Sequence, residues 1–266
     1  MKGKNVNFIV GAGAVENAWA PVIKAIKETL RIETNGDGAN FLFARYIYLL
    51  KFYAKLSSKG DYADYLDGMK SNISILKQNI ANELIKAQNT GEIKAQKNFK
   101  EIVNKFVSSN LDKALLVSTN WDEIIDIEIN KLFCSNHPKP NSKIESFHIH
   151  GSVKTPEEIY LPSEITQENF RTEDEENKMG SNHANLMSFL EKGNRTILYG
   201  ISLDPLDAEL IQTLAAGWST SNIEEIIIVN PSHEKVAKRV KLMINERYPA
   251  KIYGYDPNNL DLKIEY

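Results

Sequence analysis

The stretch Asn5-Val6-Asn7-Phe8-Ile9-Val10-Gly11-Ala12-Gly13-Ala14 decides the fold, because it predicts a buried strand that runs into a glycine-rich turn. Its apolar residues are β-branched or aromatic, as in the strands of a parallel sheet that is covered on both faces. Gly11 and Gly13 carry no Cβ, so the turn can approach a bulky ligand and point amide N–H groups at a phosphate. A Gly-Ala-Gly turn after a strand is also a common tight connection to a helix, and alone it decides little.

The composition indicates a globular chain with one large core, or a core and a smaller lobe. The chain has 266 residues, of which 42% are hydrophobic and 25% charged. No apolar segment follows Met1, and no run approaches the roughly 18 apolar residues of a membrane span, so we expect a cytoplasmic protein without a membrane partner. The formal net charge of −3, with Lys and Arg scattered among acids, gives no reason to expect direct nucleic-acid binding.

Short apolar runs alternate with helical segments through much of the chain, which predicts an α/β fold. We expect a Rossmann-like parallel sheet of six strands with helices on both faces, formed by residues 1–34 and 111–266. After the first strand, the expected strands are Ala114 to Val117, Phe147 to Ile149, Thr196 to Tyr199, Glu225 to Val229 and Lys251 to Tyr253.

Residues 35–110 are expected to form an all-helical insert packed on this core. Helical periodicity covers Ala39 to Leu56, Tyr62 to Lys86 and Ile93 to Val107. The first of these segments has more apolar surface than one buried stripe needs, so we expect it to contact a second subunit or a partner protein. Its aromatic residues are Phe41, Phe43, Tyr46, Tyr48, Phe52 and Tyr53. Further along, the acidic stretch Glu173 to Glu176 is expected to be a solvated loop.

Small polar residues follow each of the later strands, at the edge where parallel α/β sheets bind ligands. Each of them alone has a structural explanation, because such residues cap helices and form turns. Together they indicate a site for phosphate, ribose or a charged ring on one rim of the sheet. The segments are Thr119-Asn120-Trp121-Asp122, His148-Ile149-His150-Gly151, Gly200-Ile201-Ser202 and Asn230-Pro231.

These motifs, in this order, resemble the sirtuin-like family, in particular the bacterial sirtuin-like NAD+ hydrolase domains of antiphage defence systems. Gly11 to Ala14 resembles the family's phosphate loop, Thr119 to Asp122 its Asn-containing signature, and His150-Gly151 its His-Gly pair. Tyr199 to Leu203 and Val229 to Pro231 resemble the strand ends that hold the adenosine half. The family's protein deacylases carry a four-cysteine zinc module, which the single cysteine Cys134 cannot build, so deacylation is disfavoured and no metal is expected.

The resemblance implies an enzyme that consumes NAD+ as a substrate, giving nicotinamide and ADP-ribose, and that depletes NAD+ in antiphage defence by abortive infection. It implies that the enzyme works as a homo-oligomer or in a complex with a partner defence protein. It assigns catalytic roles to His150, Asn120 and Asp122. It assigns NAD+ binding to Gly11, Ala12, Gly13, Ala14, Thr119, Gly200, Ser202 and Asn230.

The chemistry of bond cleavage suits these residue types. His150 is the expected base, because an unperturbed histidine pKa of about 6.5 allows proton uptake near neutral pH. By the resemblance, Asn120 would bind the ribose or orient the attacking water, and Asp122 would bind the carboxamide of nicotinamide. His148 lies two residues before His150 and would share its face on a strand, so the adjacent Gly151 and the family pattern are what favour His150. Trp19 either closes over the nicotinamide or packs against the helical lobe.

Two other functions fit the same motifs. One is a module that binds NAD+ or an ADP-ribose derivative and signals without turnover. The other is ADP-ribosyl transfer, which shares the first half of the reaction. A dehydrogenase is disfavoured, because no acidic residue follows the glycines at a strand end by roughly twenty residues, although Glu33 lies near that distance.

Overall fold

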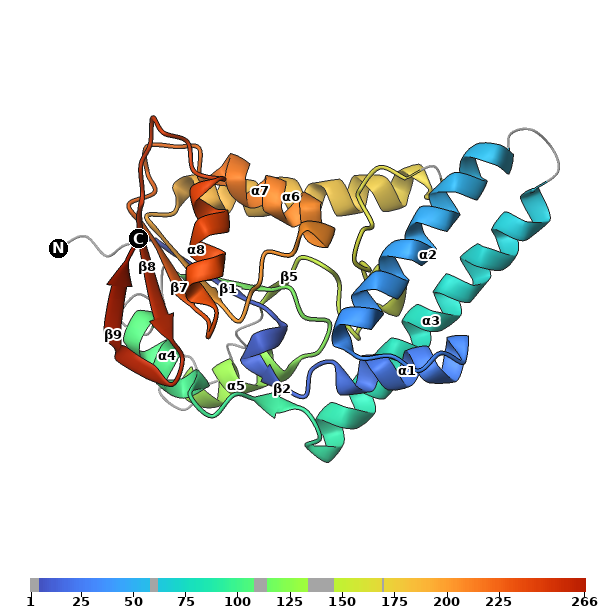
Figure 1. Ribbon diagram of the computed structural model, residues 1–266, viewed down its shortest axis with the longest axis horizontal. Coiled ribbons are helices and arrows are strands. Elements are labelled where there is room, and N and C mark those ends of the chain that lie inside the picture. Colours follow the sequence, from blue (N-terminus) through green and yellow to red (C-terminus); the bar gives the residue numbers. More distant parts are fainter. Residues whose placement is uncertain (1–4, 58–61, 108–113, 134–145, 169) are drawn as a thin grey trace.

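The computed structural model describes residues 5–57, 62–107, 114–133, 146–168 and 170–266, so Cys134 lies outside the described residues. Its centre is a seven-stranded sheet in the order β5-β4-β1-β6-β7-β8-β9 (Figure 1). All neighbouring strands are parallel except β8 and β9. The strands are β1 (Val6–Val10), β4 (Ala114–Ser118), β5 (Phe147–His148), β6 (Arg195–Tyr199), β7 (Glu225–Val229), β8 (Lys251–Asp256) and β9 (Asn259–Glu265). The fold is therefore α/β and Rossmann-like, with a mostly parallel sheet.

The sheet has seven strands and not the six predicted, because the edge strand β9 was missed. β9 follows β8 through a tight turn in which the amide of Asn258 donates to Asp256 Oδ1 at 2.8 Å. Leu260 is the one buried residue of β9. An antiparallel edge strand that faces solvent needs few apolar residues, so hydrophobicity does not reveal it.

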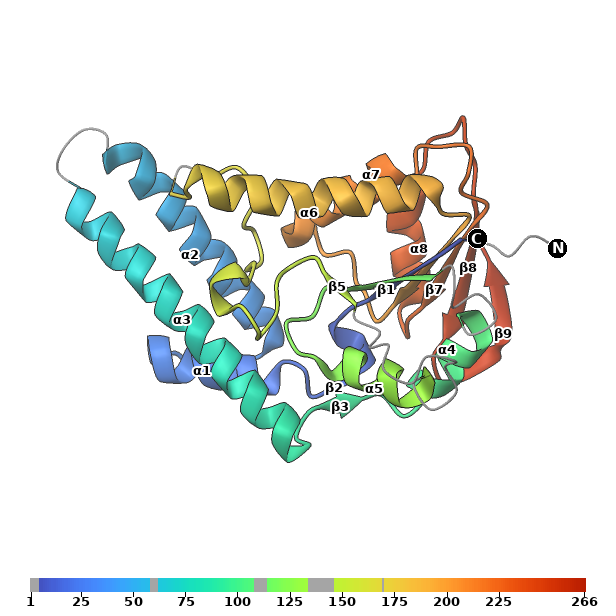
Figure 2. The ribbon, with the colours of Figure 1, turned by 180° about the vertical axis from the view of Figure 1, so that it is seen from behind.

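Helices cover both faces of the sheet, as predicted (Figures 1 and 2). Alternate residues of β1 enter two separate cores, since Phe8 and Val10 belong to one core and Ile9 to the other. The core around Phe8 is covered by α4 (Phe99–Phe106) and α5 (Ile124–Phe133). The core around Ile9 is covered by α6 (Glu173–Lys192), α7 (Ala208–Gly217) and α8 (His233–Lys241).

The acidic stretch Glu173 to Glu176 is the first turn of α6, so the prediction of a loop there is wrong. Thr172 accepts a hydrogen bond from the Glu175 amide, and the Glu175 carboxylate accepts one from the Thr172 amide. This capping box satisfies two helix N–H groups, and carboxylates in a first turn also favour the positive end of the helix dipole. The Thr-x-x-Glu spacing was the signal in the sequence.

Three helices form an arm that extends away from one end of the sheet (Figures 1 and 2). The arm consists of α1 (Ala20–Leu30), α2 (Gly36–Ser57) and α3 (Ala63–Thr90). After it, β3 (Lys94–Ala95) pairs with β2 (Val15–Glu16), so an all-helical insert is not confirmed. A two-residue strand carries too little periodicity to be predicted. None of the described helices is long and apolar enough to cross a membrane.

The strand order reverses at β1, because the chain continues to β4 and β5 on one side and later to β6, β7 and β8 on the other. The turns after β1 and β6 consequently touch. The amide of Gly11 donates to the Tyr199 carbonyl oxygen at 2.9 Å, and that of Gly13 to the Gly200 carbonyl oxygen at 3.0 Å. Ligands of open α/β sheets bind in the crevice beside such a reversal.

Candidate functional site

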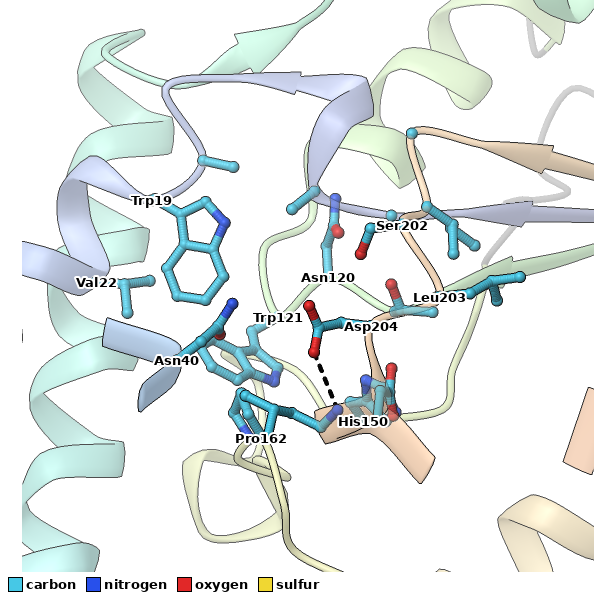
Figure 3. Close-up of a pocket in the computed structure, with 18 of the residues that line it drawn as sticks. Trp19, Val22, Asn40, Asn120, Trp121, His150, Pro162, Ser202, Leu203 and Asp204 are labelled. Atoms are coloured by element: carbon cyan, nitrogen blue, oxygen red, sulfur yellow. Dashed lines mark hydrogen bonds and ion pairs between the residues drawn. The ribbon is translucent and has the colours of Figure 1, made fainter. Parts of the chain in front are cut away.

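A cavity of about 460 Å³ lies at the carboxyl ends of the strands, between the sheet and the arm (Figure 3). Small-molecule sites typically enclose roughly 300–1,000 Å³. Most of the site residues predicted from the sequence line this cavity: Gly11, Ala12, Thr119, Asn120, Asp122, His150, Gly200, Ser202 and Asn230. Gly13 and Ala14 do not line it.

The turn after β1 takes its shape from the turn after β6. A Cβ on Gly13 would lie 2.9 Å from the Gly200 carbonyl oxygen, and one on Gly11 would lie 2.7 Å from the Ile201 side chain. The amides of Gly13 and Ala14 donate to carbonyl oxygens within the protein. The two glycines therefore serve the approach of one backbone turn to another, whereas the sequence suggested the approach of a ligand. Gly11 and Ala12 are the residues of this turn that line the cavity.

Asn120 presents an unmatched polar group to the cavity. Its backbone amide donates a hydrogen bond to Ser118 Oγ at 3.1 Å, which fixes the backbone after β4. The residue is only 7% exposed, and its side-chain Nδ2 has no hydrogen-bond partner in the protein. Leaving a buried donor unpaired costs roughly 1–3 kcal/mol, so a ligand acceptor is expected here. Figure 3 shows the Asn120 side chain projecting into the cavity.

Asp122 is buried in the same loop, two residues before the start of α5. Its Oδ1 accepts a hydrogen bond from the Ile124 amide at 3.0 Å, as a helix-capping carboxylate does. Burial raises the pKa of Asp122 to about 6. Near neutral pH the side chain is therefore partly protonated and can donate a hydrogen bond to a carbonyl oxygen that enters the cavity.

His150 is the histidine of the cavity, and it is 8% exposed. Its ring stacks on Tyr160 with ring centroids 5.6 Å apart, and its Nε2 lies 3.3 Å from Asp207 Oδ1. The latter contact brings opposite charges together without hydrogen-bond geometry, so Nε2 has no hydrogen-bond partner in the protein. Burial is the largest single influence and lowers the pKa of His150, but the contacts with Asp207, the Thr119 backbone and Glu209 together outweigh burial, so the pKa is raised.

His148 has partners outside the cavity. Its Nδ1 lies 2.9 Å from the carbonyl oxygen of Asn120, and its Nε2 lies 2.9 Å from Asp126 Oδ2. The expectation that both rings share one strand face is wrong, because β5 ends at His148 and the chain turns through Gly151, whose φ is 72°. This turn directs the two rings to different surroundings, so His148 is a structural residue and His150 faces the cavity.

A buried polar network stands behind His150. The Tyr160 hydroxyl donates a hydrogen bond to the Glu209 carboxylate. Burial has the largest effect on the pKa of Tyr160 and the contact with Glu209 the next largest, and both raise it. His183 lies on the far side, with Nδ1 2.7 Å from Thr213 Oγ1 and Nε2 3.6 Å from a Glu209 oxygen. Tyr160 thus stays protonated and forms a fixed wall for the imidazole ring.

The wall that carries Tyr160 is tied to the arm by buried ion pairs. Lys77 of α3 lies 3.0 Å from Glu164, which also lies 3.0 Å from Arg171. Lys51 of α2 lies 2.7 Å from Glu168. Both carboxylates are buried, so removal of Lys51 would leave Glu168 without this cation in the interior, and removal of Lys77 would leave Glu164 with Arg171 alone; both changes are unfavourable. The arm therefore holds one wall of the cavity in place.

The two sides of the cavity differ in chemistry. Figure 3 shows Trp19, Val22 and Asn40 on one side and Ser202 and Leu203 on the other. The first side comes from the arm and the turn that precedes it. Trp19 packs on the core shared with the arm, as one of the two expectations has it, and it also lines the cavity. Near it, Trp121 Nε1 is buried and has no hydrogen-bond partner in the protein.

The Ser202 side is polar and carries two cations as well as the acidic Asp204, which follows Leu203. Arg239 of α8 donates to the carbonyl oxygens of Ser202 and Leu203 at 2.8 and 2.9 Å, and Lys235 also lines the cavity. Asn230 uses its Nδ2 to hold the Ile201 carbonyl oxygen and its Oδ1 to accept from the Ser232 amide. Asn230 therefore shapes this side of the site, and the two cations favour an anionic ligand.

Sequence reasoning missed Asp207, Tyr160, Lys235 and Arg239. Tyr160 lies in a loop and Asp207 in the short 3-10 turn that precedes α7, and only the folded chain brings them to His150. Lys235 and Arg239 are at positions i and i+4 of a helix, a spacing that in the sequence indicates only an ordinary solvated helix face. Compared with known proteins, the chain matches no family model, no curated protein and no solved structure.

Proposed function

We propose that the chain hydrolyses NAD+ to nicotinamide and ADP-ribose. The observation that carries the proposal is the pair of buried, unpartnered groups, Asn120 Nδ2 and His150 Nε2, that line one cavity at the reversal of the strand order. Groups of this kind bind a ligand that has both acceptors and exchangeable protons, as a ribose and an attacking water do.

In the proposed reaction the bond between the ribose C1′ and the nicotinamide nitrogen breaks, and its electron pair stays on nicotinamide. A water oxygen forms the new bond to C1′ and loses one proton. His150 Nε2 takes up this proton as general base, and Asp207 stabilises the imidazolium that results. Asn120 Nδ2 donates to a ribose hydroxyl or to the attacking water, which orients the reactants.

The two sides of the cavity agree with the two halves of NAD+. Trp19 and Trp121 offer aromatic faces for the nicotinamide ring, and the partly protonated Asp122 offers a hydrogen bond to its carboxamide. Arg239 and Lys235 favour the pyrophosphate and the adenosine half. The cellular role that we propose with this activity is NAD+ depletion in antiphage defence, in keeping with the order of the motifs.

The test is incubation of the purified chain with NAD+ that is labelled in the adenosine half, with chromatography of all products. We expect nicotinamide and labelled ADP-ribose in equal amounts. Label on protein instead would indicate ADP-ribosyl transfer. Tight binding by calorimetry, with NAD+ recovered intact, would indicate a binding module without turnover.

Asp207→Asn is expected to lower kcat by roughly 10–100-fold, because the imidazolium that forms on His150 loses the negative charge that stabilises it. It should also move the acid limb of the kcat/KM profile to lower pH. The sign follows from the base role: His150 must be neutral, Asp207 raises its pKa, and removal of that charge lets the ring stay neutral in more acidic solution.

The measurement is the pH profile of NAD+ cleavage by the wild type and two variants. Asp204→Asn is the matched control, because Asp204 also lines the cavity but caps the following turn through the Leu206 amide. Its acid limb should stay at the wild-type position. An unmoved limb in Asp207→Asn would show that Asp207 does not act on the ionisation of His150.

A further inference from the structure

Exposed aromatic side chains are concentrated on the arm. Phe41, Tyr48 and Phe52 of α2 are 67%, 69% and 50% exposed, and Tyr62 and Tyr65 are exposed at the start of α3. Elsewhere in the described part of the chain, the large exposed aromatics are Phe189 and Tyr248. The cavity does not account for the exposed aromatic residues of α2, since Phe41, Tyr48 and Phe52 do not line it.

The three aromatic residues of α2 form one stripe. Their spacing of seven and then four residues brings them to the same face of a helix. The opposite face of α2 carries Phe43, Ile47 and Leu50, which are buried in the core that the arm shares with the sheet. Packing of the arm therefore uses one face of α2 and leaves the aromatic stripe in solvent.

Charged residues complete this stripe, at the same helical spacing. Asp37 precedes Phe41 by four residues, Arg45 follows it by four, and Lys55 lies beyond Phe52; all three are exposed. Read along α2, the stripe is acidic, aromatic, basic, aromatic, aromatic and basic. Asp37 also lines the cavity, so the stripe begins at the rim of the candidate site.

We propose that the stripe binds a second copy of this chain, with the two α2 helices antiparallel about a twofold axis between Arg45 and Tyr48. In this register Phe41 of each copy faces Phe52 of the other. Arg45 faces Tyr48, a cation over an aromatic ring, and Asp37 comes close to Lys55. Each contact occurs twice, as a twofold interface requires.

A second copy fits the stripe better than another partner does, because the order of residues along the stripe is complementary to its own reverse. Reversal of the stripe matches aromatic to aromatic, cation to aromatic and acid to base at every position. The formal net charge of −3 opposes pairing of two copies only weakly. The three aromatics remove roughly 350 Å² per copy from water. This is less than the roughly 800 Å² per partner of a standard interface, so the dimer dissociates in the micromolar range.

The first test is sedimentation velocity of the purified chain between about 1 and 200 µM, without ligand. The mass should rise from the monomer value of 30.1 kDa towards twice that value. Phe41→Glu and Tyr48→Glu should each raise the dissociation constant at least about 30-fold. The matched control is Phe189→Glu on α6, which should dimerise as the wild type does. A wild type that stays monomeric, or a dimer that is insensitive to both α2 variants, would overturn the proposal.

The second test concerns the antiparallel register. Asp37→Lys and Lys55→Asp should each weaken the dimer about threefold to tenfold, and the double variant should restore it, because the charges are exchanged across the axis. Failure of the double variant to recover would exclude this register. Circular dichroism and melting curves verify that each variant is folded. Both tests are made without NAD+, so their outcome is independent of the proposed hydrolase activity.

Discussion

His150→Ala is expected to lower kcat for NAD+ cleavage by roughly 10²–10⁴-fold, the usual contribution of a general base. The physical reason is the loss of the one imidazole that lines the cavity with an unpartnered nitrogen, among the described histidines. Asp207 and Tyr160 hold the ring from two sides. Binding of NAD+ should weaken far less than turnover, since the phosphate and adenosine contacts remain.

The measurement is kcat by nicotinamide release, with the dissociation constant for NAD+ from calorimetry. His150→Gln keeps much of the ring's volume, so it separates loss of the base from loss of packing and should be as inactive as the alanine variant. His233→Gln is the control, because His233 does not line the cavity and its ring contacts the Tyr266 hydroxyl. Asn120→Ala tests the second unpartnered group. Full activity of the His150 and Asn120 variants together would show that the reaction takes place elsewhere.

The central strands could be predicted from the sequence because burial on both faces requires a continuous apolar run. Glu225–Val229 is such a run, and it was predicted with the bounds that the structure has. At one edge β5 (Phe147–His148) lies within the predicted strand Phe147 to Ile149, whereas β9 at the other edge has only one buried side chain and was missed. Hydrophobic patterning therefore predicts the centre of this sheet better than the edge strand β9.

The candidate site was predictable as far as it follows strand ends. Asn120, His150 and Ser202 come after β4, β5 and β6, and parallel strands end at one rim, so their convergence could be expected. Asp207 and Tyr160 could not be found in this way. Their role depends on a distance of 3.3 Å and on a ring stack that form only after the loops have folded onto His150. The difference between His148 and His150 likewise depends on where β5 ends.

Gly200→Ala is expected to lower the free energy of unfolding by about 3 kcal/mol and to abolish NAD+ turnover. Gly200 has φ of 67°, which costs a residue with a side chain roughly 1–2 kcal/mol. The added Cβ would also lie 2.4 Å from the Ala14 amide nitrogen and 2.6 Å from the Gly13 carbonyl carbon. These are backbone atoms, so the turn after β1 must move as a whole and take Gly11 and Ala12 with it.

Gly91→Ala is the matched control for this variant. Gly91 ends α3 with a nearly equal φ of 74°, but a Cβ there meets no atom within 4 Å. The free energy of unfolding of Gly91→Ala should therefore fall only by the conformational cost of roughly 1–2 kcal/mol, and the variant should keep its activity. Urea unfolding and the NAD+ cleavage assay measure both quantities on both variants. If Gly200→Ala were no less stable than Gly91→Ala, the turns after β1 and β6 would not touch in solution. The contact that shapes the cavity where the strand order reverses would then be absent.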